Sequence, residues 1–312
     1  MKIKLFLYLV LVTVFSTGSL LSAETKADLQ PKTVSDAYPN LTSGALSFAF
    51  LKDLPDNILL KADGIEITSE SIAKIIGSQP EQARGELESN AFFVLEQEAA
   101  NHLLLNLAGK TMSQSLKDIS NQKDADIIQQ FFEKQVFKNI EVTGEELKAF
   151  YENNKDICGG ATLDQVGAAL KEYLVAQKKQ QMASEYIHAL GKKVSIQVSQ
   201  AWVKKHAALA LDNPVDKARQ SKKPSLVDFG ATGCRPCDMM APVLETLRKK
   251  HEGKLNVIFI HVRRQQILTS RYGIQSIPVQ VFFDKNGKEV FRHIGFFPQD
   301  EIEKKLKEIG VQ

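Results

Sequence analysis

The stretch FGATGCRPCDMMAPVLETL, residues 229–247, holds two of the three cysteines of this chain. Cys234 and Cys237 are separated only by Arg235 and Pro236, between a predicted strand and a predicted amphipathic helix. A cysteine at such a junction lies at a helix N-terminus, where backbone N–H groups and the helix dipole favour the thiolate. The second cysteine follows about one helical turn later. The spacing therefore favours two sulfurs that can react with each other.

A metal site and a structural disulfide are the alternatives for this pair. A structural zinc site needs four ligands, and the chain has no second cysteine pair, while His251, His261 and His293 are scattered. A permanent disulfide over so short a loop restricts the unfolded chain least. Redox chemistry is favoured, with no metal and no dissociable cofactor expected.

The residues around the pair alternate between strand and helix patterns after a boundary at Asp212-Asn213-Pro214. This alternation predicts an α/β domain over residues 212–312. The predicted strands are 225–230, 256–262, 279–283 and 289–295, and the predicted helices are 235–250, 264–272 and 299–309.

Residues 215–312 resemble the thioredoxin family, through VDFGATGCRPCDMMAPVLETL and RYGIQSIPVQVFFDKNGKEV in the family's order and spacing. The resemblance implies a thioredoxin fold and thiol–disulfide oxidoreductase activity. It implies that Cys234 is the attacking thiol and Cys237 the resolving one. It also implies that Asp228 is the buried proton acceptor and Pro278 the cis-proline that faces the pair. A structural carboxylate is the alternative for Asp228.

The chain departs from the family's usual pattern near the pair. Gly233 stands where the family usually has Trp, Arg235 where it usually has Gly, and Val279 where Thr is common. Phe259 takes the place of a buried lysine, so Asp228 is expected to be harder to ionise. We expect Gly233 and Arg235 to tune the site, with the guanidinium favouring the thiolate and a more oxidising pair. A solvated Arg235 is the alternative.

The N-terminus predicts export. Lys2 and Lys4 precede the apolar run LFLYLVLVTVF, and small residues follow to Ala23. This pattern is typical of a secretory signal over residues 1–23 that is cleaved, and an uncleaved membrane anchor is the alternative. We expect a protein secreted across the inner membrane into a bacterial periplasm, where disulfides persist. It would meet the membrane only if the segment is uncleaved.

The residues between the signal and the α/β domain predict a mainly helical domain. Residues 24–56 carry no strong period and predict an irregular leader. NILLKADGIEIT, residues 57–68, predicts a β-hairpin that can pair with a strand at 193–199. Between them the pattern is helical, with a capping box at Thr143 and Glu146 and a long helix from Thr162 to Leu190 that ends before Gly191. A last helix is predicted over 202–211.

Residues 57–211 resemble SurA-like and trigger-factor-like chaperones without the parvulin isomerase domain. The resemblance rests on LLKADGIEITSESIAKII, VTGEELKAFYENNKD and LDQVGAALKEYLVAQKKQQMASEYIHALGKKVSIQV. Only DICGG separates the two segments that flank the isomerase in those proteins. The resemblance implies a peptide-binding domain, and a generic helical spacer or dimerisation unit is the alternative. Cys158, in this short connection, is expected to be an exposed, unpaired thiol, and pairing between subunits or with Cys234 are the alternatives.

Together these patterns predict two domains, a mainly α domain with a small hairpin followed by an α/β thioredoxin fold. The net charge of +3 without a basic cluster argues against nucleic-acid binding. The expected partners are unfolded or cysteine-containing client proteins and a redox partner protein. The alternative function is a periplasmic binding chaperone or assembly factor whose thioredoxin domain is mainly a docking module. Service to one client, such as a cytochrome's haem-binding cysteines, is a third.

Overall fold

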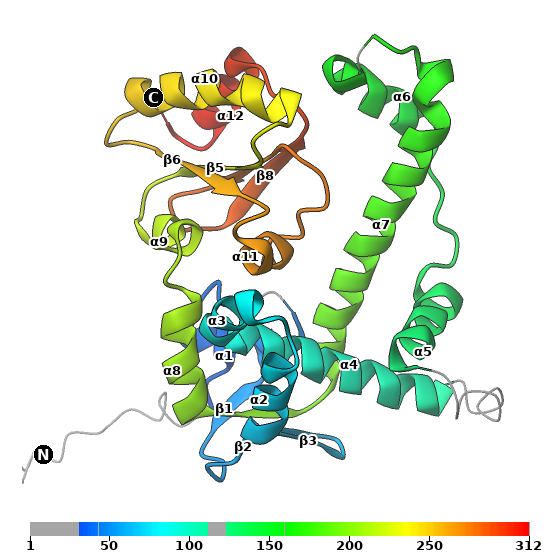
Figure 1. Cartoon of the computed structure of the whole chain (residues 1–312), viewed down its shortest axis with the longest axis vertical. Helices are drawn as coiled ribbons and strands as arrows, with labels where there is room; N and C mark the ends of the chain where they lie inside the picture. Colours follow the sequence, from blue (N-terminus) through cyan, green and yellow to red (C-terminus); the bar gives the residue numbers. More distant parts are fainter. Residues whose placement is uncertain (1–30, 43, 112–122, 159, 312) are drawn as a thin grey trace, which may run out of the picture. The chain divides into compact units, whose positions relative to one another are not determined.

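The computed structural model describes residues 31–42, 44–111, 123–158 and 160–311. Residues from Lys32 onward form one contact unit, in which two sheets occur. Figure 1 shows the first sheet at the labels β1, β2 and β3 and the second at β5, β6 and β8. We call residues 32–211 the N-terminal region and 212–312 the C-terminal domain. The predicted signal segment, residues 1–23, lies outside the described residues.

The N-terminal region contains a four-stranded sheet of order β1-β4-β2-β3. Its strands are β1 (Phe50–Lys52), β2 (Ile58–Ala62), β3 (Ile65–Thr68) and β4 (Ile196–Ser199). The predicted hairpin is confirmed, with β2 and β3 antiparallel and joined at Gly64, whose φ of 77° suits glycine. β4 pairs antiparallel with β2, as the sequence predicted, so the sheet joins strands from both ends of the region.

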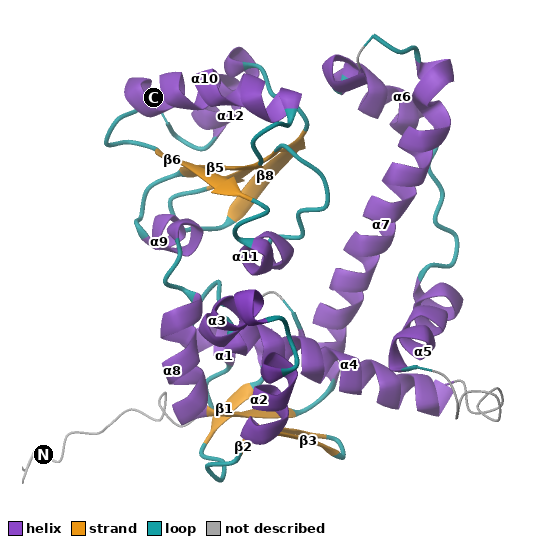
Figure 2. Ribbon diagram, viewed as in Figure 1, coloured by secondary structure: helices purple, strands orange, loops and turns teal. Residues whose placement is uncertain are grey.

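Helices make up most of the N-terminal region (Figure 2). They are α1 (Val34–Ala37), η2 (Ala45–Phe48), α2 (Ser69–Gly77), α3 (Glu81–Ser89), α4 (Ala91–Thr111), α5 (Asp124–Phe131), the π-helix η4 (Phe132–Val136), α6 (Gly144–Asn153), η5 (Lys155–Cys158), α7 (Leu163–Lys193) and α8 (Gln200–Ala210). Phe92, Leu95 and Ala99, three or four residues apart on α4, are buried on one face of this helix. The capping box at α6 is confirmed, because Thr143 Oγ1 accepts from the Glu146 amide and the Glu146 carboxylate accepts from the Thr143 amide.

The prediction of an irregular leader is wrong for residues 33–52. This segment forms α1, η2 and β1, and β1 pairs parallel with β4. Val34, Ala45 and Leu46 are fully buried in the same core as the hairpin. The elements are too short to show a period in the sequence, and burial against distant elements stabilises them instead.

The predicted end of the long helix before Gly191 is also wrong. Helix α7 continues through Gly191 to Lys193. A Cβ atom at Gly191 would lie 2.3 Å from the carbonyl oxygen of Ala45, so the glycine allows η2 to approach the helix. A close approach of backbones, and not a helix stop, explains this residue.

The C-terminal domain has a four-stranded sheet of order β6-β5-β7-β8. Its strands are β5 (Ser225–Gly230), β6 (Asn256–His261), β7 (Val279–Phe283) and β8 (Glu289–Ile294), and its helices are α9 (Pro214–Gln220), α10 (Arg235–Lys250), α11 (Gln266–Arg271) and α12 (Gln299–Glu308). β5 and β6 are parallel, whereas β7 runs antiparallel to both β5 and β8. All four strands and three of the helices follow the prediction. Helix α9, which Asn213 caps at the predicted boundary, was not predicted from the sequence.

Helices cover both faces of this sheet, α10 and α12 on one side and α9 and α11 on the other (Figure 1). Strand alternation sorts the residues between the two faces. On β5, Leu226 packs with Met240 and Leu244 of α10, whereas Val227 and Phe229 pack in the other cluster. Asp228, between them in sequence, therefore points to the α10 face.

No helix among the described residues is long and apolar enough to span a membrane.

Candidate redox site

Cys234 and Cys237 lie at the N-terminus of α10, directly after the loop that follows β5. The two sulfurs are joined in a disulfide, with the Cα atoms 5.2 Å apart. Cys234 is the residue that caps the helix, and Cys237 lies inside its first turn. Cys234 is half-buried, whereas Cys237 is only 5% exposed. The two sulfurs therefore differ in access: a large reactant can reach Cys234, and Cys237 is shielded.

The loop before β7 lies against the outer sulfur. Cys234 Sγ is 4.0 Å from the carbonyl oxygen of Ile277. The peptide bond between Ile277 and Pro278 is cis, as the sequence analysis expected. A protein segment that reached Cys234 would thus also meet the backbone of this loop.

Asp228 is fully buried below the pair, on the central strand β5. Its neighbour across the ladder on β7 is Gln280, whose Nε2 donates a hydrogen bond of 2.7 Å to Asp228 Oδ1. Burial raises the pKa of Asp228 from 3.8 to about 6, and the hydrogen bond from Gln280 opposes that rise. Asp228 Oδ2 has no hydrogen-bond partner within the part of the chain described. The carboxyl group therefore changes its charge near neutral pH.

Gln280 was not among the residues predicted from the sequence. Its signal was a single polar residue in VQVFF, a strand whose five residues are all buried. A polar side chain in such a strand needs a partner, and Asp228 is that partner.

Comparison with known proteins identifies the domain. The thioredoxin family model matches residues 203–308. A thioredoxin from Alicyclobacillus acidocaldarius subsp. acidocaldarius is 41% identical over 98 residues, which cover 31% of this chain and 92% of the relative. One from Chlorobaculum thiosulfatiphilum is 40% identical over 88 residues, 28% of this chain and 81% of the relative. The chain belongs to the thioredoxin family.

The solved thioredoxin from Nicotiana alata is 33% identical, with 30% of this chain and 80% of that chain covered and a TM-score of 0.28. Membership of the thioredoxin family supports a thiol–disulfide oxidoreductase function for the C-terminal domain. The family model begins at residue 203, so the resemblance of residues 57–211 to SurA-like chaperones stays a prediction.

The structure shows the conformation or exposure of two residues that depart from the usual thioredoxin sequence, Gly233 and Arg235. Gly233 has a φ of 77°, a left-handed conformation that a tryptophan would adopt only with strain. Arg235 is the first residue of α10 and is exposed to solvent. Its charge is next to Cys234 in sequence but is screened by water.

Phe259 does not fill a buried position. It lies opposite Asp228 on the edge strand β6 and is 41% exposed. A Cβ atom at Gly230 would lie 2.9 Å from Phe259 Cε2, so the ring reaches the space beside Asp228 and Cys237. It supplies no charge and no hydrogen-bond donor to the carboxyl group.

The third cysteine is a free thiol. Cys158 ends η5 and is half-buried rather than exposed, with its Sγ 3.5 Å from the carbonyl oxygen of Asn154. No cluster of three or more histidine, cysteine or acidic side chains that could hold a metal ion occurs in the described ranges.

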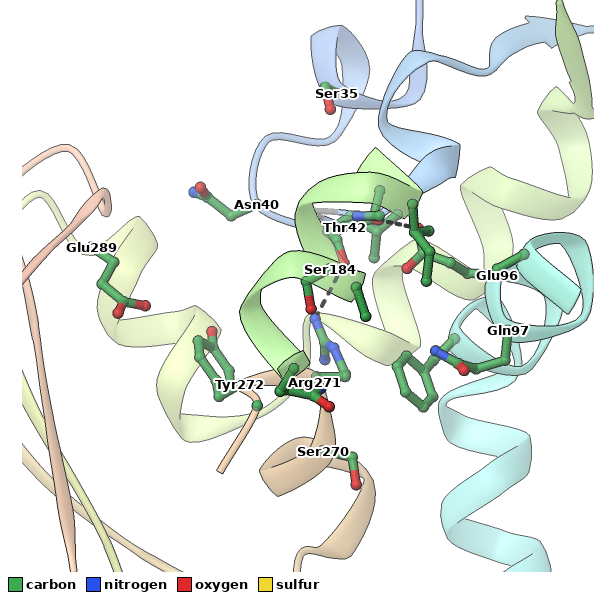
Figure 3. A pocket seen from close by; sticks show the side chains of 18 of the residues that line it. Ser35, Asn40, Thr42, Glu96, Gln97, Ser184, Ser270, Arg271, Tyr272 and Glu289 are labelled. Atoms are coloured by element: carbon green, nitrogen blue, oxygen red, sulfur yellow. Dashed lines mark hydrogen bonds between the residues drawn. The ribbon is translucent and has the colours of Figure 1, made fainter. Parts of the chain in front are cut away.

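A separate cavity is lined by other ionisable groups (Figure 3). Glu96 is buried there, and burial raises its pKa although the Thr42 hydroxyl donates to its carboxylate. Arg271 and Tyr272 also line the cavity, and Figure 3 shows their side chains close together. The lining includes neither cysteine of the pair, so this cavity is not the redox site.

Proposed function

We propose that this protein is an exported thiol–disulfide oxidoreductase that exchanges disulfides in client proteins, and that its helical N-terminal region holds those clients. The observation that carries the proposal is the asymmetric cysteine pair at the N-terminus of α10, with Cys234 accessible and Cys237 5% exposed. The helix N-terminus favours a thiolate at the accessible sulfur.

In the reductive direction, the Cys234 thiolate attacks one sulfur of a client disulfide. The client S–S bond breaks, one client sulfur leaves as a thiolate that takes a proton from water, and a Cys234–client disulfide forms. The Cys237 thiol then transfers its proton to Asp228. The Cys237 thiolate attacks Cys234 Sγ, the mixed disulfide breaks, the second client sulfur leaves, and the Cys234–Cys237 disulfide forms.

Two electrons pass from the cysteine pair to the client in this sequence. A redox partner protein with a dithiol returns the pair to its reduced form, and the reverse sequence oxidises a client dithiol. The loop at Ile277-Pro278 contacts the client backbone, because it lies 4.0 Å from Cys234 Sγ. No cofactor is needed, since the exchanging bonds are all between sulfur atoms.

The long helix α7 supports the client-holding role. Its apolar stripe, Leu163, Val166, Leu170 and Leu174, is half-buried at every position, so part of its apolar surface can contact an apolar segment of a client. The N-terminal pattern over residues 1–23 supports export to a compartment where disulfides persist.

Reduction of insulin by the full chain, with dithiothreitol as the electron source, tests the proposal. We expect the wild type to accelerate precipitation of the insulin B chain, and Cys234→Ser to lower the rate to that of dithiothreitol alone. Cys158→Ser, the matched control, should keep the wild-type rate. Cys237→Ser should accumulate a mixed disulfide that mass spectrometry detects. Equal rates for wild type and Cys234→Ser would overturn the mechanism.

The alternative is a binding protein whose thioredoxin domain docks partners. Met239 and Phe259, two large apolar side chains 42% and 41% exposed, favour it. The reduction potential of the pair against glutathione separates the two functions. A pair that does not equilibrate with glutathione within hours would favour docking.

A further inference from the structure

Gln280 is a buried polar residue for which a structural role alone gives no reason. It is fully buried on β7, between Val279 and Val281, and its side chain points to the α10 face of the sheet. An apolar residue of similar size would fill this place without the cost of burying an amide. Its position in the ladder, directly opposite Asp228, suggests why an amide is there.

The amide makes one well-defined contact. Gln280 Nε2 donates to Asp228 Oδ1 over 2.7 Å, and among the described side chains it is the one that donates to this carboxyl group. The other neighbour across the ladder, Phe259, has no donor to offer. A donated hydrogen bond stabilises the ionised carboxylate more than the neutral acid. The contact thus favours the form of Asp228 that can accept a proton.

The second carboxylate oxygen and the inner cysteine both lie next to Gly230. Asp228 Oδ2 would lie 3.5 Å from a Cβ atom at Gly230, and Cys237 Cβ would lie 3.4 Å from the same point. Gly230 adds no side chain there, and the Phe259 ring, with Cε2 2.9 Å from the same point, borders this space. Oδ2 also lacks a hydrogen-bond partner within the described ranges, which leaves its lone pairs available.

We propose that Gln280 is a positioning residue of the redox site, which holds Asp228 Oδ1 so that Oδ2 alone exchanges a proton with the Cys237 thiol. This role rests on the proposed oxidoreductase function. Gln280 touches neither sulfur in this role and acts only through Asp228. Proton transfer takes place at Oδ2, and the amide keeps the carboxyl group ionised and correctly turned for it.

The test removes the donor and follows Asp228 directly. In the full chain, carboxyl-labelled aspartate gives the ionisation midpoint of Asp228 by ¹³C NMR, without any client. We expect Gln280→Leu to raise this midpoint by about one pH unit, because a hydrogen bond to a charged group is lost. The pH midpoint of insulin reduction should rise with it, so that activity below the midpoint falls about tenfold.

Two further variants separate the hydrogen bond from packing. Gln280→Glu keeps the shape of the side chain but adds a second acid, and should raise the midpoint at least as much as Gln280→Leu. Val281→Ala loses buried volume on the same strand, on the face away from Asp228, and should lower stability without moving either midpoint. A Gln280→Glu midpoint equal to that of the wild type would mean that only shape matters, and would overturn the proposal.

The failures of the two proposals are distinguishable. A wild-type chain that does not accelerate insulin reduction overturns the proposed function. An active chain whose Asp228 midpoint is the same in Gln280→Leu overturns only the role of Gln280.

Discussion

Two buried aspartates of the C-terminal domain have opposite environments. Asp216, on α9, is fully buried and accepts hydrogen bonds from Asn213, Arg219, Arg271 and Tyr272. Asp228, on β5, is equally buried, but within the described part of the chain it accepts from Gln280 alone. Two guanidinium groups compensate the first carboxylate, and none of the described cations pairs with the second.

The difference separates a carboxylate with full hydrogen-bond compensation from one with little. Asp216 joins α9 to Arg271 and Tyr272, 55 and 56 residues further along the chain, and both of its oxygens are occupied. Asp228 has one oxygen that no described residue contacts by a hydrogen bond, and burial raises its pKa to about 6. A group that must gain and lose a proton near neutral pH needs such incomplete compensation.

The largest expected effect is a loss of stability when Asp216, the compensated carboxylate, is removed. Asp216→Ala leaves Arg219 and Arg271 without their carboxylate, with side chains only 13% and 9% exposed. Breaking a buried pair in this way costs about 3–5 kcal/mol, which urea unfolding at pH 7 measures. Asp212→Ala, which breaks an exposed pair with Lys217, is the control and should change stability little. Equally small losses of stability in Asp216→Ala and Asp212→Ala would contradict the structural role of Asp216.

The second prediction concerns Asp228, where removal of the acid is expected to raise the stability of the fold instead of lowering it. The folded-state pKa of Asp228 is above its unfolded value of 3.8, so the folded state holds the proton more tightly and stability falls as pH rises from 3.8 to about 6. Asp228→Asn has no carboxyl group at this position and should not show this loss of stability with rising pH. Its stability relative to the wild type should be about 3 kcal/mol greater at pH 8 than at pH 3.5, from the size of the shift.

Unfolding of the oxidised protein at both pH values measures this difference. Insulin reduction by Asp228→Asn should fall at the same time, because the proton acceptor is gone. A variant that is no more stable at pH 8 than at pH 3.5, relative to the wild type, would show that the carboxylate is compensated after all.

The smallest expected effect comes from a substitution that gives Asp228 a neighbouring cation, as Asp216 has. Phe259→Lys places a cation on the edge strand beside the carboxyl group, which should lower the pKa of Asp228 by about one unit. The side chain is partly exposed, so the shift should shrink as salt increases. Phe259→Leu, without a charge, is the control, and carboxyl NMR titration is the measurement. The same midpoint in both variants would place the lysine charge out of reach of Asp228.

Local sequence pattern was sufficient to predict most of the strands and helices of the C-terminal domain. Strands β5 and β7 and helix α10 have the bounds predicted, because alternation and helical spacing are properties of a few consecutive residues. The same holds for the cysteine pair, whose function depends on a spacing of three residues and a helix start. Export, client holding and the tuning roles of Arg235 and Gly233 stay predictions.

Local sequence patterns could not predict contacts between segments that are distant in the chain. The leader became α1, η2 and β1 because Val34 and Leu46 pack into a core built by later helices. Gly191 resembled a helix stop, although it is the point where η2 approaches α7.

The sequence alone therefore determined that this chain carries a thioredoxin-type cysteine pair, since strand, helix and spacing are written in consecutive residues. Only the tertiary structure decided how each buried acid is compensated. Asp216 meets its arginine and tyrosine, and Asp228 meets Gln280, through segments that are more than fifty residues apart in sequence. The physical reason is that a buried carboxyl group takes its pKa from the groups around it in space.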